Sequence, residues 1–570
     1  MTAAEQEQAV APTGAQEPSG ASSMSSSQLN SPEDKADEDD FTLSNRGKLV
    51  FVTLAVLTLM AALDGTSLSV ALPQIATELN GSAIEAFWSG TAFLLASTLF
   101  QPSFASFSNI FGRKPLVLTA IMFFLVGAVV AGVAQNFTAM LVGRTIQGVG
   151  GGGILALTEI IVTDIIPLRQ RGKYFGIISA MWSVGSVVGP ILGGGFSQNV
   201  SWRWILYINF PFIGLGVLFV LLFLKLNFAP TSLAQKLRSV DYVGTVLFVG
   251  STASFLIPLS WGGVMYDWDS WRTLVPLLIG IAGLVAFVTY EYRFASQPII
   301  PPTIFQNRTS TVSMIGSFLQ GLILWCTLYY LPLYYEAVKG YTPILAGVAL
   351  FPETFTVAPS AMVVGFAVTY TGKYRWAIWL GWILSTIGLG LMCIIKSDTS
   401  VAGWIFLNIV PGLGLGVLFP SLGFAIQASA TNENLAIAVA MFSFFRAFGQ
   451  AIGVAIGGVV FQNQMHSQLL TYPALAPMAD QYSRDAAGLV QILKLMPDGD
   501  DKSNLRTAYT DSLRIVWAVC CAISGVALLL SLLTESYDLN RALSSKQGLR
   551  DKKKNQSDEE QTVEKSEDTK

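Results

Sequence analysis

The stretch GSVVGPILGGGFSQN, residues 185–199, indicates a duplicated fold, because its pattern recurs at GQAIGVAIGGVVFQN, residues 449–463. Both stretches place glycines at a spacing of four residues and end in a Gln-Asn pair. Residues four apart lie on one face of a helix, and glycines there let a second helix approach closely. The matching glycines are 264 residues apart: Gly185, Gly189 and Gly193 correspond to Gly449, Gly453 and Gly457.

The same offset continues in the segment that precedes each copy. There Gly148, Gly150 and Gly152 correspond to Gly412, Gly414 and Gly416. A constant offset through two consecutive helices indicates a duplicated unit rather than a chance match. We therefore predict two six-helix repeats in parallel orientation, with a binding site between them near the middle of a membrane.

The composition places these helices in a lipid bilayer. Of the 570 residues, 52% are apolar and 12% are charged, and the mean hydropathy is +0.53. Soluble domains carry about 25% charged residues, so this chain predicts an all-α polytopic membrane protein. A membrane-spanning helix needs about 20 mainly apolar residues. Fourteen such runs begin near Leu49, Phe87, Leu116, Ala139, Tyr174, Trp204, Tyr242, Thr273, Val312, Pro343, Ala377, Trp404, Ala438 and Leu513.

We expect five segments along the chain. Residues 1–45 form a disordered acidic tail, since residues 1–40 hold nine acids, one lysine and no apolar run. Residues 46–227 and 311–535 form the two six-helix bundles, and residues 228–310 hold two linking helices. The second bundle includes a long loop at 462–511. Residues 536–570 form a second tail, which carries the basic cluster 552–554.

The loop charges predict the orientation, because loops that remain in the cytoplasm are rich in Lys and Arg. Alternate loops hold the cations, beginning with Arg46 and Lys48 and continuing with Arg113 and Lys114. Both tails are therefore expected in the cytoplasm and loop 462–511 outside. The tripeptides at Asn80, Asn136 and Asn199 then fall outside as candidate glycosylation sites, and chance tripeptides are the alternative.

Asp64 is the first candidate for a functional charge. It lies in the apolar first span, where a carboxylate is costly unless it faces a cavity or a partner. A carboxyl group in such surroundings can take up and release protons. The alternative is an acid that only packs helices and is satisfied by Thr66 or a neighbouring helix.

Arg144 and Gln147 lie three residues apart in the fourth span, beside small residues. A fixed cation near Asp64 would tune the proton affinity of that acid. The alternative for Arg144 is a side chain that reaches the membrane surface. In the second half, Glu353 and Arg446 are candidates for the substrate or ion pathway. They could also pair with each other or lie near the surface.

The fifth span contains a candidate joint. Gly185, Gly189 and Gly193 form a smooth face, Gly194 follows, and Pro190 removes a backbone hydrogen bond and introduces a bend. Packing alone explains most such ladders, but a proline in the middle favours a helix that moves.

Other residues of the sequence exclude several classes of function. Four cysteines lie in apolar segments without metal spacing, and a single histidine, His466, rules out a multi-histidine centre. The glycines from Gly148 to Gly153 follow an apolar helix rather than a strand, so we reject nucleotide binding. We expect no metal, no cofactor, no nucleic-acid partner and no enzyme activity.

These segments resemble the major facilitator superfamily, and specifically the fourteen-span fungal drug:proton antiporters. The resemblance covers about residues 45–535. The matching motifs run from Asp64 to Pro73, from Arg144 to Gly150, from Trp182 to Gly195, and from Trp202 to Asn209. The third of these resembles the antiporter motif that separates exporters from uptake relatives.

One motif departs from the family pattern. Gly112, Arg113 and Lys114 resemble the loop between the second and third spans, where the family has a glycine and an aspartate upstream. This chain has Ala105 and Asn109 there. The resemblance therefore leaves gating by this loop in doubt.

The resemblance implies proton-coupled efflux of small amphipathic compounds, such as drugs, antifungals or toxic metabolites, by a monomer in the plasma membrane. A vacuolar or vesicle membrane is the alternative location. Asp64 is expected to carry the proton and Arg144 to bias it. The alternatives are a proton-linked permease for a metabolite, siderophore or organic acid, and a membrane sensor that does not transport.

Overall fold

The computed structural model describes residues 42–81, 83–227, 232–263, 265–484, 486–540 and 547–548. Residues 43–570 belong to one unit of the chain, which is described here. The expected acidic tail lies outside the described residues up to position 41, as does the basic cluster 552–554.

Regular structure in the described residues is helical, apart from a bridge residue at Leu226 and an isolated bridge between Gly262 and Tyr266. This confirms the predicted all-α membrane fold, because a helix satisfies its own backbone hydrogen bonds in lipid. The long helices of the first half are α2 (Asn45–Ser67), α4 (Ala83–Phe111), α5 (Arg113–Gly132), α6 (Phe137–Ile165), α7 (Arg171–Asn199) and α9 (Asn209–Phe223). Those of the second half are α13 (Arg308–Ala337), α15 (Phe351–Thr371), α16 (Arg375–Met392), α17 (Val401–Ser429), α18 (Leu435–Leu469) and α21 (Asp500–Ser531).

Two more long helices, α11 (Tyr242–Trp261) and α12 (Trp271–Arg293), form a pair between the halves in the chain. The short helices are α3 (Leu72–Glu78), α8 (Trp204–Tyr207), α10 (Leu233–Arg238), α14 (Pro343–Ala349), α19 (Ala479–Ser483) and α20 (Ala486–Leu495). The 3₁₀ turns are η1 (Leu68–Val70), η2 (Leu168–Gln170), η3 (Pro302–Phe305) and η4 (Ala476–Met478).

Thirteen helices in the searched residues are long and apolar enough to cross a membrane. The helix α4 is not among them, but its 29 residues pack along α6. Adding it gives the fourteen spans that the sequence predicts.

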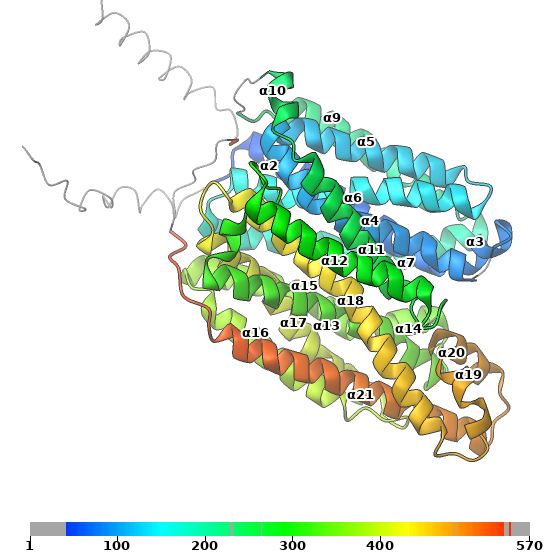
Figure 1. The fold of residues 1–570 in the computed structure, drawn as a ribbon. Helices are drawn as coiled ribbons and strands as arrows, with labels where there is room; N and C mark the ends of the chain where they lie inside the picture. Colours follow the sequence, from blue (N-terminus) through cyan, green and yellow to red (C-terminus); the bar gives the residue numbers. More distant parts are fainter. Residues whose placement is uncertain are drawn as a thin grey trace, which may run out of the picture. The chain divides into compact units, whose positions relative to one another are not determined.

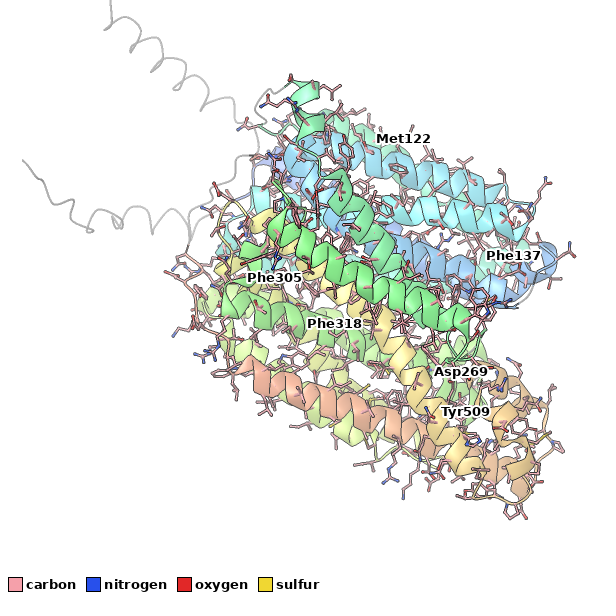
Figure 2. All side chains as sticks on the ribbon, in the orientation of Figure 1. Met122, Phe137, Asp269, Phe305, Phe318 and Tyr509 are labelled. Carbon is pink, nitrogen blue, oxygen red and sulfur yellow. The ribbon has the colours of Figure 1, made fainter. Side chains whose placement is uncertain are left out.

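The bundle has two ends. We call the end where α2 begins and α21 ends the basic face, because it carries Arg46, Lys114, Arg169, Lys173 and Lys373. The opposite end is the loop face. Figure 1 shows α10 at the first end and α3, α14, α19 and α20 at the second, and Figure 2 marks Phe305 near the basic face and Phe137 near the loop face.

Two boundaries differ from the prediction. The tenth span begins at Phe351 rather than near position 343, because α14 forms a separate short helix capped by Thr342. The predicted loop 462–511 is also shorter, since α18 continues to Leu469 and α21 begins at Asp500. The end of α18 and the start of α21 carry polar residues, so these helices extend beyond the apolar runs that mark a span.

The two halves repeat the same glycine contacts. A Cβ atom at Gly148 would lie 2.4 Å from the carbonyl oxygen of Phe93, and one at Gly412 would lie 2.5 Å from that of Glu353. Likewise, a Cβ at Gly152 or at Gly416 would lie 2.1 or 2.3 Å from a carbonyl oxygen of α4 or α15. Only glycine allows helices this close. The repeat seen in the sequence is therefore a repeat of packing.

The halves meet along a seam where α7 packs on α15 and α17, and where α18 packs on α4 and α6. At the basic face, Arg169 Nε donates to the carbonyl oxygen of Thr369 at 3.0 Å, and Arg171 Nη1 donates to Gln427 Oε1 at 3.0 Å. A Cβ atom at Gly172 would lie 2.5 Å from the carbonyl oxygen of Gly365. The seam is thus closed at this end.

Candidate functional site

The carboxylate of Asp64 lies inside the first half and accepts hydrogen bonds from three side chains. Arg144 Nη1 donates to Oδ2 at 2.6 Å, which also makes an ion pair. Gln147 Nε2 and Asn209 Nδ2 each donate to Oδ1 at 2.8 Å. Asp64 is 1% exposed and the three donors are fully buried, so the charges are shielded from water.

The guanidinium of Arg144 is held from several sides. Its Nε donates to the carbonyl oxygen of Ser89 at 3.0 Å, and its Nη1 donates to Gln147 Oε1 at 2.7 Å. Its carbon Cζ lies 4.5 Å from the ring centre of Phe93. The remaining nitrogen, Nη2, finds no hydrogen-bond partner in the described part of the chain.

The local sequence explains this arrangement. Asn136 caps the start of α6 by accepting from the backbone N–H of Ala139 at 2.9 Å. Arg144 and Gln147 then lie on one face, since residues three apart in a helix are neighbours. Gly148 brings α4 close enough for Phe93 to reach the guanidinium. A buried carboxylate and a buried cation are costly inside a membrane unless they are paired, and here each satisfies the other.

The sequence predicts Asp64, Arg144 and Gln147 as site residues, and the structure brings them together. Asn209 ends one of the family motifs, but the sequence does not predict it as a site residue. Its signal was a lone amide in the strongly apolar run 208–224. Its second amide atom, Oδ1, has no hydrogen-bond partner in the described part of the chain.

Glu353 and Arg446 do not form the pair that was one expectation for them. Glu353 is fully buried, and Thr327 Oγ1 donates to its Oε1 at 2.8 Å. Its Oε2 lacks a partner among the described residues. Arg446 instead lies over Phe419, with 4.5 Å between Cζ and the ring centre, and interacts electrostatically with Glu159.

Three of the glycines in α7 face α2. A Cβ atom would lie 2.5 Å from Ala62 Cβ at Gly185, 2.1 Å from Thr66 Oγ1 at Gly189, and 2.1 Å from the carbonyl oxygen of Ser67 at Gly193. Gly194 differs, since nothing lies within 4 Å of its Cβ position. Pro190 is inside the same helix, one residue after Gly189.

The loop motif at 112–114 forms its ion pair with an acid of another helix, α6. Gly112 has a φ of 94°, a conformation that glycine adopts easily, and precedes α5. Arg113 Nε pairs with Asp164 at 2.9 Å, and its Nη1 donates to Asn109 Oδ1 at 2.7 Å. Lys114 Nζ donates to the carbonyl oxygen of Leu221 at 2.8 Å. Asp164 thus supplies the negative charge that Asn109 lacks.

The three candidate glycosylation residues, Asn80, Asn136 and Asn199, are exposed at the loop face. Two of their side chains already bond to backbone groups nearby, Asn136 as the cap of α6 and Asn199 to the carbonyl oxygen of Gly195 at 2.9 Å. Whether sugars attach there stays a prediction.

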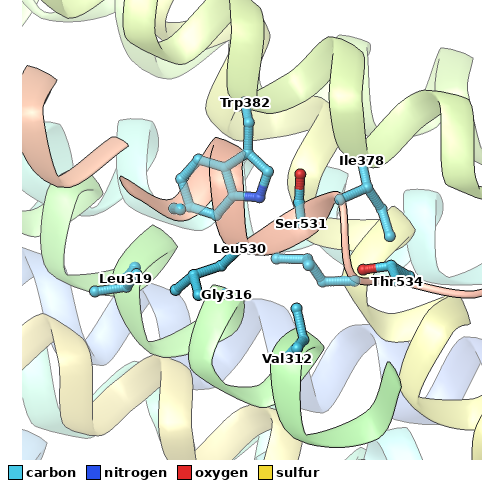
Figure 3. A pocket seen from close by; sticks show the side chains of 10 residues that line it. Val312, Gly316, Leu319, Ile378, Trp382, Leu530, Ser531 and Thr534 are labelled. Carbon is cyan, nitrogen blue, oxygen red and sulfur yellow. The ribbon is translucent and has the colours of Figure 1, made fainter. Parts of the chain in front are cut away.

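The cavity in Figure 3 lies within the second half, between α13, α16, α17 and α21. It has a volume of about 10 Å³, which is room for about one water molecule. A second space of about 10 Å³ lies at the seam, between Phe175 of α7 and Phe419, Gly423 and Phe442 of the second half. Neither space can hold an organic substrate in this closed arrangement.

The charged site occurs in one half only. At the offset of 264, Arg144 corresponds to Asn408. Between α2 and α13 the offset of corresponding residues is 259. The α7 glycines contact Leu59 and Leu63 of α2, and the matching α18 glycines contact Phe318 and Leu322 of α13. Asp64 therefore corresponds to Ile323. The repeat conserves the packing of the two halves but not their charges.

Comparisons with known proteins agree with this fold. The family model of the Major Facilitator Superfamily matches residues 54–454. The MFS transporter L2 of Phoma sp. is 55% identical over 512 residues, covering 90% of this chain and 86% of that protein. The efflux pump FUS6 of Gibberella moniliformis is 38% identical over 528 residues, covering 91% of this chain and 94% of that protein.

Solved structures show the same fold at low identity. The human organic anion transporter MFSD10 aligns with a TM-score of 0.52 and 16% identity, covering 85% of this chain and 98% of its own. The proton:xylose symporter XylE aligns with a TM-score of 0.51 and 13% identity, covering 86% and 97%. With fourteen spans, a duplicated glycine ladder and these relatives, the chain belongs to the Major Facilitator Superfamily and is a membrane transporter.

Proposed function

We propose that this transporter exports small amphipathic organic compounds, such as drugs, antifungals or toxic metabolites, in exchange for protons. The observation that carries the proposal is the buried carboxylate of Asp64, held by Arg144, Gln147 and Asn209 in the membrane interior. Relatives described as an efflux pump and as the transporter of an acurin A biosynthesis cluster support the direction and the kind of substrate.

In this proposal, Asp64 is the proton carrier. With the carboxylate charged, the ion pair with Arg144 holds α2 against α6. When a proton neutralises Asp64, the attraction to Arg144 weakens and the two helices can shift relative to each other. Because binding of proton and substrate favours different arrangements, the two are exchanged across the membrane.

We further propose that the two six-helix bundles, 46–227 and 311–535, rock about the substrate site as a monomer in the plasma membrane. The glycine face of α7 on α2 would serve as the moving joint. Both termini would lie in the cytoplasm, at the basic face.

The test is a comparison of cells with and without the protein, using a panel of labelled amphipathic compounds. Lower accumulation that depends on the chain, and that a protonophore abolishes, is the expected result. Higher accumulation of one compound would instead favour a proton-linked importer. No change for any compound, with the protein in the membrane, would favour a sensor.

A further inference from the structure

A second buried carboxyl group, Glu159, lies near the basic end of α6 and is 7% exposed. Ser443 of α18 donates a hydrogen bond from its Oγ to Glu159 Oε2. Arg446, almost one turn further along α18, interacts electrostatically with the same carboxylate. Since α6 belongs to the first half and α18 to the second, Glu159 connects the halves across the seam.

Arg446 depends on this acid for its counter-charge. Its guanidinium lies 4.5 Å from the ring centre of Phe419 and 5.9 Å from that of Phe442. Its Nε is buried without a hydrogen-bond partner in the described part of the chain. A buried cation without a counter-charge is costly, so the charge on Glu159 stabilises Arg446 where it lies.

The other charged groups at this end of α6 have partners of their own. Arg113 of α5 pairs with Asp164, and Lys114 reaches the carbonyl oxygen of Leu221. Arg171 of α7 donates to the carbonyl oxygens of Ile166 and Thr163. The helix α4 carries a single charged residue, Glu85, near the loop face, and the charges of α2 at this end are Arg46 and Lys48. Attraction between Glu159 and the second half therefore comes from α18.

The mirror contact shows that close packing needs no acid here. At the offset of 264, Glu159 corresponds to Gly423, Ser443 to Ser179 and Arg446 to Trp182. These residues belong to α17 and α7, which also pack on each other across the seam. The hydroxyl of Ser179 is buried with no partner among the described residues. This side of the seam, which Arg169 and Arg171 bridge, closes without an acid at the position of Glu159, so close packing alone does not explain Glu159.

We infer that Glu159, Ser443 and Arg446 form a proton-sensitive latch. While Glu159 is charged, the latch holds the seam closed at the basic face, and protonation of Glu159 releases it. Glu159 is a positioning residue, because it acts on helix packing through Ser443 and Arg446. The inference deepens the proposed function and rests on it, since it assigns the latch to the same cycle.

The latch is separate from the Asp64 site. Arg144 and Glu159 are 15 residues apart on α6, which is about 22 Å along the helix axis. Asp64 lies toward the loop face, whereas Glu159 lies toward the basic face. A proton that Glu159 takes from and returns to the basic side moves no net charge across the membrane. The latch thus gates the cycle without driving it.

The experiment measures the seam directly. Spin labels at Lys48→Cys and Lys373→Cys, both exposed at the basic face and in different halves, report the distance between halves. The full chain, freed of its four native cysteines and shown to retain transport, is measured in lipid nanodiscs from about pH 5 to about pH 8. No substrate and no gradient are present. We expect the wild-type distances to lengthen as the pH falls.

Glu159→Gln should raise the ratio of open to closed molecules about tenfold and remove its pH dependence. Glu159→Gln combined with Arg446→Gln should restore the closed distance, still without pH dependence, because no unpaired charge remains. Thr158→Val is the matched control, since it removes the neighbouring buried hydroxyl of α6 and should behave as the wild type.

A wild-type distance profile and pH response in Glu159→Gln would overturn the latch, and so would an identical opening in Thr158→Val. Asp64→Asn should keep the pH response of the latch. A normal latch in a protein whose export needs no protons would refute the proposed function alone.

Discussion

Few residues carry the proposed function, because ionisable groups inside a membrane are rare and need partners. Asp64 accepts hydrogen bonds from Arg144, Gln147 and Asn209. The guanidinium of Arg144 also donates a hydrogen bond to the carbonyl oxygen of Ser89. The whole cluster draws on α2, α4, α6 and the start of α9. Such a network is sensitive to the loss of any one charge.

Replacing Asp64 by Asn should abolish uphill export, because the amide keeps the shape but cannot release a proton. Downhill exchange should persist. The change also leaves Arg144 buried without a counter-charge, at a cost of about 3–5 kcal/mol. Asp64→Asn with Arg144→Gln should therefore recover stability but not uphill export. The measurement is substrate uptake into inverted vesicles with an imposed pH gradient; wild-type uphill transport by Asp64→Asn would end its role as proton carrier.

The sequence identified the first three members of this cluster, since a charge in an apolar run is visible without coordinates. Asn209 and Glu159 could not be found in the same way. An uncharged amide carries a weaker signal, and Glu159 lies close to Asp164 and to a basic loop, where an acid is ordinary. The partner of Arg446 is 287 residues away in the chain, and only the packing of α6 on α18 reveals it.

At the scale of elements, α7 has two unlike surfaces. One surface meets α2 through glycines at spacing four, and the other leaves Gly194 and Gly195 with open space around them. Helix identity and order could be predicted from hydropathy and spacing. The end of α18 and the separate helix α14 could not, because polar caps and turns interrupt or extend the apolar runs.

Gly193→Ala should damage the joint, since its new methyl group would lie 2.1 Å from the backbone oxygen of Ser67. We expect a loss of about 1–3 kcal/mol in stability and a marked fall in transport rate. Gly195→Ala is the matched control, because it adds the same methyl group where nothing lies within 4 Å. It should be neutral or slightly stabilising, as alanine favours helices by about 0.5–1 kcal/mol over glycine. Thermal unfolding and initial transport rates measure both; equal effects of the two changes would reduce the ladder to ordinary helix surface.

At the scale of the whole molecule, the charges separate the two faces. The basic face carries the cations of alternate loops, so we expect it in the cytoplasm. A tag inserted after Gly499, an exposed position of the loop between α18 and α21, should bind antibody on intact cells. A tag at the N-terminus should bind only after permeabilisation. The reverse labelling pattern would show that the basic face lies outside the cell and that the predicted orientation is wrong.

Energy supply is also a property of the whole molecule. Collapse of the proton gradient by a protonophore should stop export within the time that the gradient takes to decay. An ATPase inhibitor that leaves the gradient intact should not. Export against a concentration difference after the gradient has gone would exclude proton exchange.

The asymmetry of the repeat limits the concentration of a toxic compound against which this transporter could protect a cell. With Ile323 and Asn408 in the second half where the first has its ion pair, the proposed cycle exchanges one proton, at Asp64, per substrate molecule. One pH unit supplies about 1.4 kcal/mol, and a potential of 100 mV adds about 2.3 kcal/mol per charge. Together they sustain a concentration ratio of about 500 for a neutral compound. Above an external dose about 500 times the harmful internal level, tighter binding by the pump would offer no further protection.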